Sequence, residues 1–258
     1  MIALRIAVVA AVLAAAAFLA YEHFEQPADQ VFGQTLTHGP ANERVIALTY
    51  DDGPNPPYTN RILDVLEQER VHATFFLVGR AVQAYPEVVH REARDGDALG
   101  NHSWDHSHLI VYPPSDVAAS IQQTDAAIRA AAGVHTRLFR PPFGARDWIV
   151  MRAAQRLGYT VVMWSEPLPR DWEYPSALQI AQRVLRVAGD GSIIVLHDGN
   201  RGELCAQQQL NPHVCDRSAD IAATRIVIDE LKKRGYRFVT IPELMAGQTT
   251  RKTARAAR

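Results

Sequence analysis

The most constraining feature of the sequence is a regular alternation between short apolar segments and longer amphipathic ones. The apolar segments predict seven strands, at residues 44–50, 72–79, 97–103, 136–140, 159–164, 192–197 and 236–240. Apolar residues at helical spacing predict intervening helices, at residues 60–71, 80–95, 115–133, 146–157, 176–188 and 219–235. Ser115 is expected to cap the third helix and Gly133 to end it. This alternation is typical of an α/β fold with a mostly parallel sheet covered by helices, either open or closed into a barrel.

The size and charge of the chain narrow the class of protein further. The 258 residues are 47% apolar, which is enough for one substantial core and argues against a largely disordered chain. The formal net charge of −1 gives no support for nucleic-acid binding, which usually requires a basic domain. We therefore expect a single folded domain that does not bind nucleic acid.

The N-terminus carries an export signal. Arg5 precedes an apolar, uncharged run that extends from Ile6 to Ala20. Residues 1–20 are interpreted either as a cleaved signal peptide or as an uncleaved N-terminal anchor in the inner membrane. Both interpretations export the remaining chain to the periplasm or the cell exterior, and the membrane is a partner only through such an anchor. A buried core helix is less favoured, because the run has no polar face.

Composition also predicts the segments that flank the main domain. Residues 21–43 are polar and are interpreted as a linker, and the domain itself spans residues 44–246. Residues 247–258 are basic and rich in small side chains, which predicts a disordered tail. Cys205 and Cys215 lie in a polar, loop-like stretch. In an exported protein such a pair favours a disulfide over free thiols, and its spacing is wider than that of zinc sites.

Polar residues gather where the predicted strands end. Asp51 and Asp52 follow the first strand, and further polar motifs follow four others: NHSWDH (101–106), RPPFG (140–144), SEPLPRDW (165–172) and LHDG (196–199). In parallel α/β barrels the C-terminal ends of the strands carry the active site. We therefore expect these five segments to meet at one mouth.

Two histidines and the paired aspartates predict a metal site. His102 and His106 are four residues apart, so a helical turn would place both imidazoles on one face. Two His and one carboxylate form a common catalytic metal set, with zinc as the default ion. The second aspartate can then take the proton of the metal-bound water, whose pKa the ion lowers toward ~7. The cation also relieves the repulsion between Asp51 and Asp52.

Three further residues have a functional interpretation beside a structural one. His197 ends an apolar strand and is either a core histidine or a general acid. Arg140 either forms a surface ion pair or orients Asp51 as its charge partner. Trp172 is either a core residue or a groove wall on which a sugar stacks.

The motifs together resemble a known family. TYDDGP, HSWDH, RPPFG, PRDW and LHD occur in the order seen in polysaccharide deacetylases with a NodB-homology domain, the carbohydrate esterase family 4 group. The resemblance covers roughly residues 44–242. It implies a distorted (β/α)7 barrel with the active site at the C-terminal ends of the strands.

The resemblance also implies a role for each motif residue. Asp51 is the catalytic base and Arg140 supports it. The residues implied to bind one divalent metal, zinc by default with cobalt or nickel as alternatives, are Asp52, His102 and His106. The acid is His197, the backbone N–H of Phe143 helps to hold the oxyanion, and Leu196 lines the acetyl pocket.

The sequence departs from the family pattern at three places. Tyr50 stands where phenylalanine is usual, and Phe143 where tyrosine is usual. The fourth motif is one residue longer, and Pro167 occupies the place of the aspartate that partners the catalytic histidine. Glu166 or Asp171 could substitute, and Asp171 is the favoured candidate.

The expected function follows from the resemblance. It is a metal-dependent, monomeric hydrolase that removes N-acetyl groups from a polymer or oligomer containing N-acetylglucosamine, such as peptidoglycan, chitin-type chains or poly-N-acetylglucosamine. The alternatives are an O-acetyl (xylan) esterase or small-amide hydrolase of the same fold, and a non-catalytic carbohydrate-binding homologue.

Overall fold

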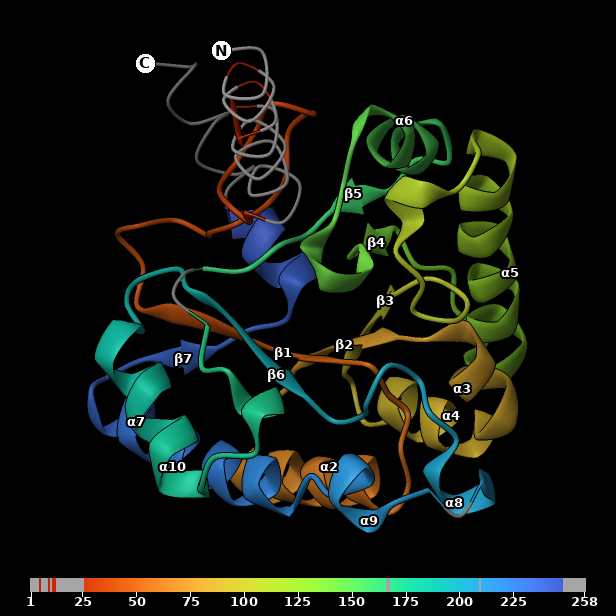
Figure 1. The fold of residues 1–258 in the computed structure, drawn as a ribbon. Coiled ribbons are helices and arrows are strands. Elements are labelled where there is room, and N and C mark those ends of the chain that lie inside the picture. The colour runs from red at the N-terminus through yellow and green to blue at the C-terminus, as the bar shows by residue number, and fades with distance from the viewer. Residues whose placement is uncertain are drawn as a thin grey trace.

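The computed structural model describes residues 26–165, 168–208 and 210–247, together with Arg5, Val9, Ala11 and Val12. In this part of the chain the strands form one curled, parallel sheet in the order β5-β4-β3-β2-β1-β6 (Figure 1). Its strands are β1 (Val45–Asp51), β2 (Thr74–Leu77), β3 (Ala98–Asn101), β4 (Leu138–Phe139), β5 (Thr160–Val161), β6 (Ile193–His197) and β7 (Arg237–Phe238). β7 pairs with the first two residues of β1, at the N-terminal end of the sheet. The fold is thus the distorted (β/α)7 barrel that the sequence predicts.

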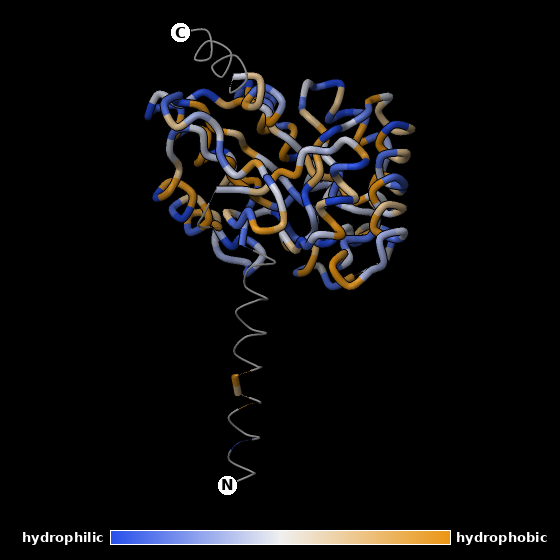
Figure 2. Tube along the Cα trace, turned by 90° about the horizontal axis from the view of Figure 1, so that it is seen from above, coloured by the Kyte–Doolittle hydropathy of each residue, from blue (hydrophilic) through white to orange (hydrophobic). Residues whose placement is uncertain are grey.

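Helices cover the outside of the sheet. They are α2 (Tyr58–Glu69), α3 (Gly79–Ala84), α4 (Pro86–Arg94), α5 (Pro114–Ala132), α6 (Trp148–Arg156), α7 (Ala177–Val187), α8 (Cys205–Gln208), α9 (Pro212–Cys215) and α10 (Ser218–Lys233). Residues 241–247 are also helical. Short 3₁₀ turns lie at η1 (Leu109–Val111), η2 (Pro142–Gly144) and η3 (Asp171–Glu173). Hydrophilic and hydrophobic residues are interspersed along the coiled parts of the tube in Figure 2, as expected for amphipathic helices.

The alternation of side chains along each strand divides the core into two layers. Ile46 and Leu48 of β1 belong to the cluster that packs against α2, α7 and α10. Val45 and Ala47 belong to the second cluster, which fills the barrel and extends to α5 and α6. Because successive residues of a strand point to opposite faces, Asp51 shares the inner face with Val45 and Ala47. The first strand therefore carries its last carboxylate into the barrel.

The predicted strands are confirmed in order, with bounds that are shorter except at β1, which is shifted by one residue, whereas the predicted helices need two corrections. The helix expected at residues 80–95 is two helices, because Pro86 lacks an N–H and begins α4. Ser115 is not the N-cap of α5, which begins at Pro114 after Pro113. The predicted end of that helix is correct, since Gly133 adopts a left-handed conformation with φ 70°.

The segment interpreted as a linker is instead part of the barrel over residues 26–43. Leu36 bridges to Val162 beside β5, and His38 bridges to Ser192 beside β6. The N–H of Leu36 donates to the Val161 carbonyl at 2.8 Å, and the Met163 N–H donates to the Leu36 carbonyl at 2.8 Å. β5 and β6 are the two edges of the sheet, so this segment satisfies backbone groups that an open edge would leave unpaired.

Other predictions fall partly or wholly beyond the described residues. Apart from four residues, the export segment at residues 1–20 lies outside them, as does the basic tail from residue 248 onward. Within the described ranges, no helix is long and apolar enough to cross a membrane. The predicted disulfide is present: Cys205 and Cys215 are bonded and join α8 to α9.

Candidate active site

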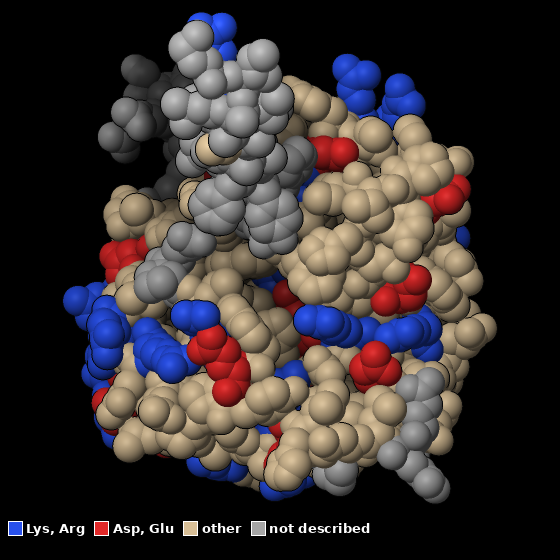
Figure 3. All heavy atoms as spheres, in the orientation of Figure 1, with Lys and Arg blue, Asp and Glu red and all other residues tan. Residues whose placement is uncertain are grey.

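A cavity of about 750 Å³ opens at the C-terminal ends of the strands. The face seen in Figure 3 is hollowed near its middle, and acidic and basic side chains lie around this hollow. The cavity is lined by residues from each predicted motif, from the start of the described range 26–165 and from neighbouring loops: Gln26, Pro27, Asp51, Asp52, His102, His106, Pro141, Phe143, Gly144, Trp164, Leu168, Trp172, Tyr174, Val195, His197, Asn200, Arg201, Glu203 and Arg217. The five strand-end segments therefore meet at one mouth.

Asp51 and Arg140 form a buried ion pair on the floor of the site. Arg140 Nη1 donates to Asp51 Oδ1 at 2.6 Å and to Thr49 Oγ1 at 2.9 Å. The other guanidinium nitrogens donate to two main-chain carbonyls beyond β5, and the ring of Phe76 lies 4.0 Å below. Burial lowers the pKa of Arg140, while the Asp51 carboxylate raises it. Four N–H groups of the guanidinium thus have acceptors, which fixes the orientation of Asp51.

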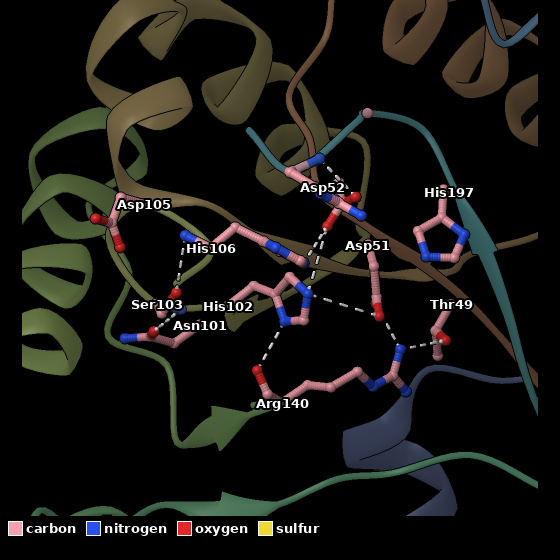
Figure 4. A network of polar contacts seen from close by, with 12 residues as sticks. Thr49, Asp51, Asp52, Asn101, His102, Ser103, Asp105, His106, Arg140 and His197 are labelled. Atoms are coloured by element: carbon pink, nitrogen blue, oxygen red, sulfur yellow. Dashed lines mark hydrogen bonds and ion pairs between the residues drawn. The ribbon is translucent and has the colours of Figure 1, made fainter. Parts of the chain in front are cut away.

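Asp52, His102 and His106 converge beside this pair (Figure 4). Nε2 of His106 lies 3.0 Å from Asp52 Oδ1, and Nε2 of His102 lies 3.4 Å from the same oxygen. One ligand atom from each of the three residues lies within 4.8 Å of the others, which is a spacing that could hold a metal ion. The sequence placed the same three residues together.

The local conformation of the histidine segment differs from the helical turn that the spacing suggested. Ser103 and His106 adopt left-handed conformations, with φ 68° and 59°, and no helix includes them. Side-chain hydrogen bonds hold the turn instead: Ser103 Oγ accepts from the His106 N–H at 3.1 Å, and Asn101 Oδ1 accepts from the Ser103 N–H at 3.0 Å. The two imidazoles meet because the loop folds back, with ring centroids 5.0 Å apart.

The polar atoms of this group fit a cation. His102 Nδ1 donates to the Arg140 carbonyl at 2.7 Å, so the lone pair of His102 is on Nε2 and faces Asp52. Asp52 Oδ1 is buried and accepts no hydrogen bond from the described residues. Burial raises the pKa of Asp52, but His106 and His102 outweigh it and hold the pKa well below its ordinary value. A carboxylate oxygen and an imidazole lone pair that point at one spot are suited to a divalent ion.

His197 and Asp171 form a second pair on the same cavity. His197 Nδ1 lies 3.0 Å from both oxygens of Asp171, and Asp171 Oδ2 also accepts from the His197 backbone N–H at 2.7 Å. Asp171 begins η3 and is 1% exposed. Burial lowers the pKa of His197, but Asp171 outweighs it and raises the pKa from 6.5 to about 9.

A further carboxyl group lies behind this pair. Asp220 of α10 is buried next to Asp171, and burial together with the charge of Asp171 raises the pKa of Asp220 well above its ordinary value. Burial also raises the pKa of Asp171, but His197 outweighs it and the net shift is downward. The two carboxyl groups are therefore unequal, with the negative charge on Asp171.

Of the remaining predicted site residues, some line the cavity and one does not. Phe143 lines the cavity in a left-handed conformation, with φ 60°, and its ring stacks on His108 at 3.8 Å. Trp172 lies on the cavity wall and is 38% exposed. Its ring and that of His197 are nearly perpendicular, with ring centroids 5.6 Å apart. Leu196, which was expected to line the acetyl pocket, is fully buried in the outer core layer. That expectation is wrong by one residue, because the strand alternation that turns His197 inward places Val195, not Leu196, on the cavity.

The sequence also left some contributing groups unidentified. Thr49 binds Arg140, and its only sequence signal is a hydroxyl on the inner face of an apolar strand. The backbone N–H of Arg201 donates to Asp52 Oδ2 at 2.7 Å, and a main-chain donor has no residue-type signal. Glu166, the other candidate partner for His197, lies outside the described residues.

Comparison with known proteins agrees with this geometry. A family model described as polysaccharide deacetylase matches residues 38–162. A peptidoglycan-N-acetylglucosamine deacetylase of Bacillus cereus is 38% identical over 208 residues, which are 80% of this chain and 90% of that protein. The chain belongs to the polysaccharide deacetylase family. The family model covers Asp51 to Arg140, whereas Asp171 and His197 lie beyond it.

Two other similarities extend the comparison to the whole domain. A chitooligosaccharide deacetylase of Azorhizobium caulinodans is 33% identical over 202 residues, covering 78% of this chain and 94% of that protein. A solved structure of a peptidoglycan N-acetylglucosamine deacetylase, in complex with 4-naphthalen-1-yl-N-oxidanyl-benzamide, has a TM-score of 0.73 and 31% identity, covering 81% and 92% of the two chains. Some family members are longer, and this chain spans about two fifths of their length. The relatives are named as deacetylases, so this family member is an enzyme of the hydrolase class.

Proposed function

We propose that this protein removes N-acetyl groups from a glycan that contains N-acetylglucosamine, with a divalent metal ion at Asp52, His102 and His106. The observation that carries the proposal is the arrangement around one cavity of a carboxylate fixed by arginine, a metal-binding group and a protonated histidine. Hydrolysis of an amide needs a base for the attacking water, stabilisation of the oxyanion and an acid for the departing amine.

Asp52, His102 and His106 would hold the ion, with zinc as the default for this ligand set. When bound, such an ion supplies Lewis-acid polarisation of a carbonyl and acidifies water. The Nδ1 hydrogen bond of His102 and the contact of Asp52 with the Arg201 backbone keep the two side chains in place before any ion arrives.

Asp51 is suited to act as the base. Its Oδ1 is engaged by Arg140, whereas Oδ2 points toward the metal-binding group, 3.9 Å from His102 Nε2. Oδ2 is therefore the atom that accepts the proton of the water attacking the acetamide carbonyl. Arg140 keeps that oxygen aimed at the reacting centre, as a positioning partner for the base.

His197 is suited to act as the acid. With a pKa of about 9, its imidazole is protonated at neutral pH. Asp171 accepts a hydrogen bond from the Nδ1–H of His197. The Nε2–H is then the proton that His197 can give to the departing amine. The Phe143 turn offers its backbone N–H to the oxyanion, and Val195 with Trp172 supplies apolar wall for the acetyl group and a sugar ring.

The names of the relatives and the N-terminal sequence support an envelope glycan as the substrate. The relatives reported above act, by their names, on peptidoglycan and chitooligosaccharides. The basic residue and apolar run at the N-terminus support export, with or without an anchor. We infer that the enzyme works outside the cytoplasm on peptidoglycan, chitin-type chains or poly-N-acetylglucosamine.

The test is acetate release from N-acetylglucosamine oligomers by the full chain, stripped of metal and then given zinc, cobalt or nickel. We expect release to return with metal, and His106→Ala to remain inactive at the same metal concentration with less bound ion. O-acetylated xylan oligomers provide the matched substrate, on which we expect weaker release. Equal activity with and without chelator, or release from the O-acetyl substrate alone, would overturn the proposal.

A further inference from the structure

The segment that begins at residue 26 is a folded part of the cavity. We call residues 26–36 the N-terminal strap. Its own side chains hold it together: Gln30 Nε2 donates to Thr35 Oγ1 at 2.9 Å, and Gln30 Oε1 accepts from the Thr35 N–H at 2.7 Å. The strap packs on α6, where the Phe32 ring meets the edge of Trp148 at a centroid distance of 5.7 Å. Gln26 and Pro27, at its start, line the cavity.

Arg146 is the centre of the contacts that join this strap to the barrel. It is 1% exposed, although it lies between η2 and α6, and it is among the largest fully buried side chains. Nη2 donates to the Gln26 carbonyl and to the Asp29 carbonyl, the latter at 2.7 Å. A longer contact of 3.4 Å joins Nη2 to the Pro27 carbonyl. A buried guanidinium is retained only where acceptors surround it, and here most of them are carbonyls of the strap.

The same guanidinium also holds the turn that carries Phe143. Arg146 Nη1 donates to the Gly144 carbonyl at 3.0 Å. Gly144 and Phe143 both line the cavity, and both have positive φ angles, of 70° and 60°. A left-handed conformation at a phenylalanine is unfavourable on its own and persists where surrounding contacts impose it.

One side chain thus bridges two walls of the cavity. The guanidinium is a rigid, planar fork, so its nitrogens fix the Gly144 carbonyl and the strap carbonyls relative to one another. A lysine at this position could place one ammonium but not two separated rows of donors. Burial lowers the pKa of Arg146, and the Asp29 carboxylate raises it.

We propose that Arg146 is a positioning residue that fixes the Phe143 turn and the start of the N-terminal strap as two adjoining walls of the substrate cavity. The proposal rests on the proposed deacetylase function for its kinetic readout. It assigns the strap a role in binding the glycan, and it assigns the arginine an indirect role in the stabilisation of the oxyanion through the turn. Neither role requires Arg146 to touch the substrate.

The first experiment compares the full-chain variant Arg146→Gln with wild type, using N-acetylglucosamine pentamer and zinc. We expect KM to rise, because the strap wall is released, and kcat to fall, because the turn relaxes. Together they should lower kcat/KM by about 10- to 100-fold, the effect of losing a buried charged donor. The matched control is Arg137→Gln, which removes an exposed guanidinium that donates to the Leu157 carbonyl at 2.9 Å. We expect it to behave as wild type.

Two further measurements separate positioning from loss of the fold. Amide hydrogen exchange should become faster over residues 26–36 in Arg146→Gln, while β1 and β6 keep wild-type protection. If Arg146→Gln does not fold, the double variant Gln26→Ala, Pro27→Gly tests the strap alone. We expect it to raise KM for the pentamer with little change in kcat. Arg146→Lys should lie between wild type and Arg146→Gln.

The outcomes distinguish this proposal from the proposed function. Absence of acetate release by wild type with every metal would count against the deacetylase itself, and the exchange measurement would still test the strap. A folded Arg146→Gln with wild-type kinetics and wild-type exchange over residues 26–36 would overturn the positioning role. Wild-type KM in the strap double variant would show that the strap is not a substrate wall.

Discussion

Asp51 lies between two histidine–aspartate groups that differ in which atoms have partners; Figure 4 shows Asp52, His102 and His106 on one side of it and His197 on the other. In the first, Asp52 Oδ1 accepts no hydrogen bond from the described residues and two imidazole nitrogens point at it. In the second, both oxygens of Asp171 contact Nδ1 of His197, and one also accepts its backbone N–H. The oxygen of the first group is placed to bind a cation, whereas the second group favours a protonated imidazole.

This difference distinguishes two kinds of site in one barrel, one suited to a metal ion and one suited to a protonated histidine. The Asp52 group comes from two loops with left-handed residues, which bring ligand atoms together without satisfying them. The Asp171 group comes from a strand end and a 3₁₀ turn, and its carboxylate is saturated by His197 together with the side chain of Asp220. A saturated carboxylate favours the imidazolium, and an unsaturated one favours a metal ion.

The largest effect is expected from Asp51→Asn, which changes the residue between the two groups. The variant keeps the size of the side chain but cannot accept a proton, so kcat should fall by about 10³-fold, within the usual contribution of a general base. Bound zinc, measured by elemental analysis, should stay at the wild-type ratio because Asp51 is not in the ligand set. Retained turnover would exclude Asp51 as the base, and lost zinc would place it among the ligands.

A smaller effect is expected from Asp171→Asn, which acts on the proton of His197. Without the carboxylate, burial lowers the pKa of His197 below about 9. The acid form is then lost at a lower pH, so the descending limb of the kcat–pH profile should move toward neutral pH and kcat at pH 8 should fall by about 10-fold or more. Wild-type zinc content serves as the control for an intact metal site.

The His197–Asp171 pair also predicts how the stability of the metal-free protein changes with pH. The pKa of His197 is raised on folding, from 6.5 to about 9, so the stabilisation is fully present below pH 6.5 and is lost as the pH rises through about 9. Wild type should therefore lose more thermal stability than Asp171→Asn between pH 6 and pH 9.5. Parallel losses in the two proteins would mean that Asp171 does not hold the proton.

The smallest effect on turnover is expected from removal of the disulfide. Cys205 and Cys215 close a short loop, and the Cys215 carbonyl accepts from Asn55 Nδ2 at 3.1 Å, near the Asp52 turn. The double variant Cys205→Ser, Cys215→Ser should lower the free energy of unfolding by about 2–3 kcal/mol, measured by denaturant titration. Metal content and kcat/KM should stay within about twofold of wild type at 25 °C. A tenfold loss of bound zinc would show that the disulfide positions the Asp52 side of the cavity.

How far the sequence predicted the molecule depends on how local each signal is. Local sequence patterns predicted the strands and the two residue pairs, Asp51–Asp52 and His102–His106. In the structure the strands form the barrel, and both pairs line its cavity. The conformation of the histidine loop was not predictable from spacing, because two residues four apart meet equally well in a helix and in a folded loop held by Ser103.

The errors have related physical causes. Leu196 was placed on the wrong face, since a one-residue shift in a strand exchanges inside and outside. The segment interpreted as a linker has a polar composition. Its sequence therefore carries no strand pattern that would indicate the pairing of Leu36 and His38 with the sheet edges. Arg146 follows a recognisable motif, but the strap carbonyls that accept its hydrogen bonds lie more than a hundred positions away, and main-chain carbonyls carry no residue-type signal.

Arg140 links Asp51 to His102 through its own covalent structure. Its guanidinium holds Asp51, and its own carbonyl accepts from His102 Nδ1, so the proposed proton acceptor and a proposed metal ligand are both attached to one residue. The separation between them is then as stiff as the bonds and packed rotamer of a single buried side chain, and it does not depend on how the surrounding loops move. The spacing between these two side chains is therefore set beneath the cavity by one buried residue and not by the residues at its rim.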